Sequence, residues 1–264
     1  MSIDLIAPVK EILDKVKQTT SKEIQFIEKD DLTTYAALRM ARKNMPSHII
    51  FVKKEHDEII NHLIAHECGH VLRLFSVSEE NRLIPKTNDQ IKLNALTEIE
   101  PEIQELSKVL PFDKLAQIVS LWYTGTYRQV TNFPPDILIE KWIYDEYPEL
   151  RQYQLKSIKK QQQEALAGLS TEVVKMTPPK FLDVSNIMNY AFFRILGFHF
   201  GINFIKPYNN TKYIGSGKKL ASLTEAEYVN SYDGDVQMIN KWADFLKLSN
   251  WFEWADFENI PNSY

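Results

Sequence analysis

The sequence His-Glu-Cys-Gly-His at residues 66–70 constrains this chain more than any other feature. It lies in a stretch, Glu55 to Phe75, that contains no proline and no glycine except Gly69, and we expect one long helix there. Residues four apart lie on the same face of a helix, so the two histidine rings can grip one metal ion. The motif stands among apolar residues, namely Leu63, Ile64, Val71, Leu72 and Leu74. A buried His, Glu and His without a metal would leave polar groups to satisfy, so a metal-binding helix is favoured over a plain core helix.

Zinc suits such a helix because it accepts imidazole nitrogen and carboxylate oxygen and keeps a fourth position open in catalytic sites. We expect His66 and His70 to bind the ion and Glu67, beside them, to act as general base on water. His62 stands one turn earlier, but three ligands on one straight helix reach one ion poorly. We therefore expect His62 to support the site from outside. Cys68 points away from the histidine face and is predicted to be a small buried residue.

The third ligand has to come from another segment. The extension that would place a third histidine nearby is absent, because Arg73 and Ser76 stand at its glycine and histidine positions. Residues 133–143 are strongly apolar, and a carboxylate there needs a partner, so we predict Glu140 as the third ligand. Asp136, one turn earlier, is predicted to accept the second ring N–H of a ligating histidine. Two alternatives stay open: Asp136 caps its helix while Glu140 makes a surface ion pair, or the ligand is Glu98 or Glu102.

The motif, preceded by an apolar strand, resembles that of the zinc metallopeptidases of the gluzincin type. Over residues 48–147 the chain is similar to the small cytoplasmic ImmA/IrrE-like family. This resemblance implies a zincin-like core, a zinc cofactor, a glutamate ligand from a later helix, and hydrolysis of a peptide or protein substrate. It also implies metal binding by His66 and His70 and a general-base role for Glu67. We expect a substrate peptide to add along an exposed edge strand at His48–Lys53. The alternatives are a zinc-dependent amidase or esterase, and a non-catalytic binding or regulatory protein of zincin fold.

The rest of the chain predicts an α+β fold, mostly α, with a small N-terminal sheet and helices after it. The strands are expected at residues 22–29 and 48–53, where apolar and β-branched residues recur. The sequence Asn-Phe-Pro-Pro-Asp at 132–136 predicts the start of a new helix, because proline suits the first turn. The sequence Gly-Ser-Gly at 215–217 predicts a flexible loop.

The length of 264 residues is sufficient for a sizeable core. We expect a zincin-like domain at 1–177 and a helical C-terminal extension at 178–264 packed on it, or alternatively a single domain. A net charge of −4 argues against a nucleic-acid partner. With a single cysteine, no signal-peptide pattern and no apolar run of about 18 residues, we expect a cytoplasmic protein without a membrane partner. The sequence makes no prediction of the oligomeric state.

Overall fold

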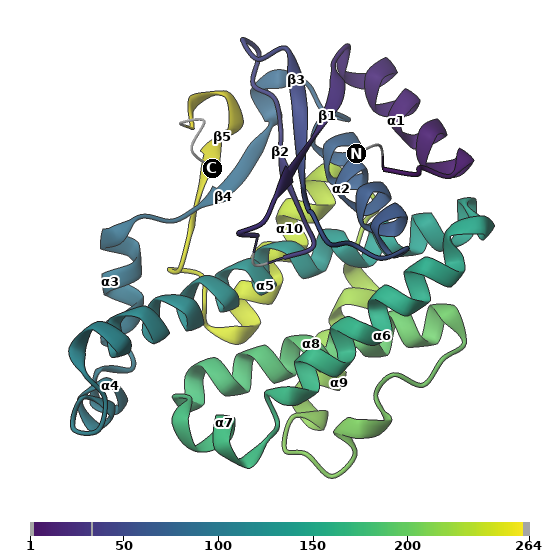
Figure 1. Ribbon diagram of the computed structural model, residues 1–264. Helices are drawn as coiled ribbons and strands as arrows, with labels where there is room; N and C mark the ends of the chain where they lie inside the picture. Colours follow the sequence, from purple (N-terminus) through teal and green to yellow (C-terminus); the bar gives the residue numbers. More distant parts are fainter. Residues whose placement is uncertain (1–2, 33, 261–264) are drawn as a thin grey trace. The chain divides into compact units, whose positions relative to one another are not determined.

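The computed structural model describes residues 3–32 and 34–260, and Figure 1 labels its elements. The helices are α1 (Ala7–Thr20), α2 (Ile60–Leu74), α3 (Asp89–Thr97), α4 (Glu100–Ser107), α5 (Phe112–Glu146), α6 (Arg151–Ala167), α7 (Thr171–Met176), α8 (Pro179–Phe200), α9 (Ile214–Glu227) and α10 (Tyr232–Leu246). The strands are β1 (Glu23–Lys29), β2 (Ala36–Arg39), β3 (Ser47–Lys53), β4 (Leu83–Lys86) and β5 (Glu253–Asp256). The protein is therefore mostly helical with small sheets, which confirms the α+β, mostly α class. None of the helices in this part of the chain combines the length and apolarity needed to cross a membrane.

The chain forms two compact units that are interleaved along the sequence. The first unit contains the described residues of 1–84, 138–160 and 255–264. The second contains residues 85–137 and 161–254. The interleaving arises because α5 runs from one unit into the other as a single helix. The division at residue 177 into a zincin-like domain and a C-terminal extension stays a prediction.

The first unit contains a three-stranded sheet in the order β1-β3-β2 (Figure 1). β1 runs parallel to β3 and β2 runs antiparallel to it, so that Phe26 and Leu38 flank Ile50 from opposite sides. β3 is therefore the central strand, and the expectation that His48–Lys53 forms an exposed edge is wrong. The physical reason lies in its near-continuous burial, which is the pattern of a strand covered on both faces.

The helix α2 packs by its apolar face into the core of the first unit. That face carries Ile64, Ala65, Cys68 and Val71, all without solvent exposure. The same core receives residues from α1, β3 and the end of α5, namely Val9, Ile12, Val16, Ile50, Val52, Ile139 and Ile143. Contacts on several sides fix the rotation of α2 about its axis, and they leave its histidine face turned away from the aliphatic core.

The helix α5 continues through Pro134 and Pro135, so the predicted start of a new helix at 132–136 is wrong. Each proline lacks the N–H that a helix interior uses, which normally breaks or kinks it. Here nearly every residue from Thr131 to Glu140 is buried. Packing therefore holds the helix where local propensity does not.

In the second unit, the apolar helix α8 packs along α9. The predicted loop at 215–217 is wrong, because these residues belong to the first turns of α9. A Cβ atom at Gly217 would lie 2.5 Å from Cδ1 of Tyr190. The glycine thus serves close helix packing instead of flexibility.

Candidate metal centre

One face of α2 carries three histidines at successive turns. The His62 side chain is 2% exposed and that of His66 is 17% exposed, while His70 is half-buried. Because the opposite face of the helix packs into the core, the three rings are presented along a single line, as the four-residue spacing predicts. His66 and His70 are thus more exposed than His62, so the later half of this face is the part open to a substrate.

The rings of His66 and His70 turn the same nitrogen toward each other. Their Nε2 atoms lie 3.2 Å apart. Two nitrogen ligands bound at the usual zinc distance in a tetrahedral site lie about 3.3 Å apart. The pair therefore already has the separation that shared coordination of one zinc ion requires.

The carboxylate of Glu140, which is 2% exposed, lies on the far side of the His66 ring. Its Oε1 accepts a hydrogen bond from Nδ1 of His66 at 2.8 Å, and its Oε2 accepts from Nε2 of His62 at 2.9 Å. Gln154 of α6 donates its Nε2 to Oε2 at 2.6 Å and to the backbone oxygen of Glu140 at 2.7 Å. Glu140 is therefore held by three donors from two other helices.

These donors also set the charge of Glu140. Burial by itself raises the pKa of this carboxyl, but the charge and hydrogen bond of His62, followed by those of His66, hold it well below its usual range. The ionised carboxylate fixes the proton of the neutral His66 ring on Nδ1. The lone pair of His66 then lies on Nε2, the atom that faces His70.

Asp136 lies one turn before Glu140 on α5 and is buried. One of its carboxylate oxygens lies within 4.8 Å of a ring nitrogen of His66 and one of His70, and this group of three can hold a metal ion. His62, His66 and Glu140 form a second group of the same kind. Each of the two acids predicted from the apolar segment thus belongs to one of these groups, and His66 belongs to both.

Glu67 and Cys68, between the two histidines, face different surroundings. Glu67 is half-buried, whereas Cys68 has no exposure and burial raises the pKa of its thiol. The prediction that Cys68 is a small core residue is confirmed. Gly69 has a packing role, because a Cβ atom there would lie 2.6 Å from Cγ2 of Ile139. This close approach of α2 to α5 places Glu140 within reach of the histidines.

The alternative ligands Glu98 and Glu102 lie outside the site, and one residue that contacts Glu140 is not predicted from the sequence. Glu98 pairs with Lys180 at 3.4 Å, and neither it nor Glu102 belongs to a potential metal-binding group among the described residues. Gln154 was not predicted, since a neutral amide in a polar helix follows no pattern that would mark it. The only available signal was its position on the helix that follows α5.

No protein-family model, no curated protein and no solved structure matches this chain.

Proposed function

We propose that this protein is a zinc-dependent hydrolase, and that it cleaves peptide bonds. The observation that carries the proposal is the convergence of two Nε2 atoms, of His66 and His70, while Glu140 engages the other nitrogen of His66. A zinc ion bound there would supply a Lewis acid that polarises a carbonyl group and makes water acidic near neutral pH. The zincin-like core and the likeness to gluzincin-type peptidases belong to this same proposal.

The ligands we assign are His66 and His70 through Nε2, and Asp136 through its carboxylate. Glu140 then orients His66 through Nδ1, with His62 holding Glu140 in turn. This exchanges the roles that the sequence predicts for the two acids. The exchange is supported by the hydrogen bonds of Glu140, whose two oxygens already accept from three donors. Two nitrogens and one oxygen form the donor set of a catalytic zinc site with an open position.

Glu67 acts as the base in this proposal. Its carboxylate removes a proton from the attacking water as the water oxygen bonds to the carbonyl carbon, and it then delivers that proton to the leaving amine nitrogen as the C–N bond breaks. Its position directly after His66 and its partial exposure support this role. No other carboxylate is adjacent to a ligand within the motif.

Metal analysis of purified variants tests the proposal. The wild type should bind one zinc ion, His66→Ala and His70→Ala should lose it, and His56→Ala, outside the motif, should keep it. Glu67→Gln should retain zinc yet lose nearly all hydrolysis of a quenched peptide library. A wild-type protein without stoichiometric zinc refutes the metal site. A zinc-loaded wild type that cleaves no peptide refutes the peptidase and leaves the non-catalytic alternative.

A further inference from the structure

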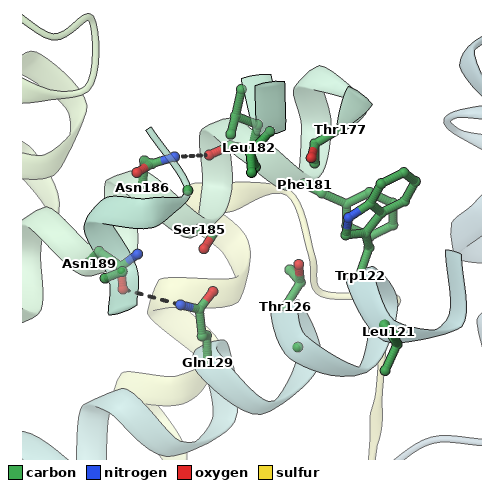
Figure 2. A pocket seen from close by; sticks show the side chains of 14 residues that line it. Leu121, Trp122, Thr126, Gln129, Thr177, Phe181, Leu182, Ser185, Asn186 and Asn189 are labelled. Atoms are coloured by element: carbon green, nitrogen blue, oxygen red, sulfur yellow. Dashed lines mark hydrogen bonds between the residues drawn. The ribbon is translucent and has the colours of Figure 1, made fainter. Parts of the chain in front are cut away.

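The second unit contains a cavity that is separate from the histidine face of α2. Its volume is about 350 Å³, within the range of small-molecule sites. Two walls come from α5 and α8, and the remaining wall comes from the end of α6 and from α7 (Figure 2). All of its lining residues belong to the second unit, and none of them belongs to a group that could hold a metal ion.

The two ends of the cavity differ in chemistry, as Figure 2 shows. At one end Trp122 and Phe181 form an aromatic pair with ring centroids 5.8 Å apart. At the other end Nε2 of Gln129 donates to Oδ1 of Asn189 at 3.2 Å. The separation of the two ends along α5, seven residues, is about 10 Å. A ligand that uses both ends is therefore elongated, with a ring at one end and hydrogen-bonding groups at the other.

The amide end also contains an unsatisfied acceptor. Asn186 is 2% exposed, and its Nδ2 donates to the backbone oxygen of Leu182 at 2.8 Å. Its Oδ1 is buried without a hydrogen-bond partner among the described residues. This oxygen has no accessible surface and is not reached from the cavity, whereas Gln129 is half-buried and offers its amide group to a ligand at this end. Hydroxyl groups suit this end because each can donate to one amide oxygen and accept from an amide N–H.

Among the residues that the structure describes, no charged side chain lines the cavity. A phosphate or carboxylate placed in it would lose water without gaining a counter-ion, which is strongly unfavourable. The ligand is therefore uncharged.

A glycine in the wall keeps the cavity open. Gly125 lies inside α5, a position where glycine is less favourable than alanine. A Cβ atom there would meet nothing within 4 Å, so no packing contact requires the glycine. Because Gly125 has no side chain, the space between the aromatic end and the amide end stays free.

From these features we infer that the cavity is a binding site for an uncharged nucleoside. The base stacks on Trp122, which is half-buried, and the sugar hydroxyls bond to the amide pair of Gln129 and Asn189. A nucleoside provides the flat ring, the length and the hydroxyl groups, and it lacks the phosphate that the neutral lining rejects.

Calorimetric titration with adenosine tests this site, with AMP as the charged counterpart. Wild type should bind adenosine saturably and bind AMP much more weakly. Trp122→Ala should raise the Kd of adenosine at least about fivefold, the loss expected for one stacked base. Gly125→Leu, whose Cβ atom meets nothing within 4 Å, should abolish binding without lowering the thermal unfolding midpoint. Arg128→Ala, an exposed neighbour on the same helix that does not line the cavity, should bind like wild type.

Three results would overturn the inference. They are the absence of saturable adenosine binding up to its solubility limit, undiminished binding by folded Gly125→Leu, and equal affinity for AMP. The first result would show that the protein does not bind nucleosides. The second would show that adenosine binds outside the cavity. The third would show that the neutral lining does not discriminate against a charged ligand.

Discussion

Replacement of Glu140 by glutamine tests which task its carboxylate performs. Glutamine keeps one acceptor oxygen and puts an NH₂ donor in place of the other. Oε1 accepts from Nδ1 of His66 at 2.8 Å and lies 3.1 Å from Nε2 of His62, whereas Oε2 accepts from His62 at 2.9 Å and from Gln154 at 2.6 Å. His62 can carry its proton on Nδ1 and accept through Nε2, so the NH₂ group is accommodated best on the Oε2 side. Gln154 then loses its bond to this position and keeps the one to the backbone oxygen of residue 140. His66 then keeps its Nδ1–H···O bond and its lone pair on Nε2.

The expected size of the effect follows from this rearrangement. Changing a group that orients a metal ligand typically weakens binding 10- to 100-fold, which corresponds to about 1.4–2.7 kcal/mol. Glu140→Ala is more severe, because it leaves three buried donors without their acceptor at about 1–3 kcal/mol each. Asp136→Ala, which removes the proposed ligand, should lose more zinc affinity than Glu140→Gln.

Competition with a chromogenic chelator measures zinc affinity, and urea unfolding of the same variants measures stability. Glu149→Gln, an exposed acid in the same unit, is the control and should match wild type in both. If Glu140→Gln binds no zinc while Asp136→Ala binds it with wild-type affinity, Glu140 is the ligand. The exchange of roles would then be wrong.

Two further predictions concern stability. Burial, and after it the charge of Lys22, lowers the pKa of His48 from 6.5 to about 4, and its Nδ1 accepts from the backbone N–H of Ala41. The unfolded chain takes up this proton below pH 6.5 and the folded chain only near pH 4, so stability should fall by about 3 kcal/mol as the pH drops through that window. The difference in unfolding free energy between wild type and His48→Asn measures this loss, and a difference independent of pH would contradict it. Gly69→Ala should lose about 1–3 kcal/mol by crowding Ile139, whereas Gly125→Ala, with open space around it, should gain up to about 1 kcal/mol. Urea unfolding compares the two, and a gain in both would refute the packing argument.

The sequence predicts the fold where local pattern and burial agree. The strand at 22–29 and the helix at 55–75 follow from periodicity, and the structure places β1 and α2 within them. It fails where packing overrides propensity, as at Pro134 and Pro135 inside α5 and at Gly217 inside α9. At Gly217 the deciding contact is with Tyr190 of another helix, and at the two prolines it is burial, neither of which a local pattern contains.

The sequence likewise predicts some features of the site and not others. The motif at 66–70 identifies the histidine face by itself, because it depends only on helix geometry. The acids Asp136 and Glu140 are found because carboxylates are rare in so apolar a segment. Their separate roles depend on which ring nitrogen of His66 faces which carboxylate, and that is set by the packing of α2 on α5. Gln154 lies beyond sequence reasoning, since its contact exists only once α6 has folded back along α5.

The packing of α2 against α5 also determines the geometry of the site. Gly69 immediately precedes His70, and Ile139 immediately precedes Glu140. The missing Cβ at Gly69 lets Ile139 approach α2, and that approach sets the 2.8 Å distance from Glu140 to Nδ1 of His66. A larger residue at position 69 pushes the helices apart and stretches this bond before it disturbs any ligand directly. Loss of orientation at His66 should therefore accompany loss of stability, since one contact determines both.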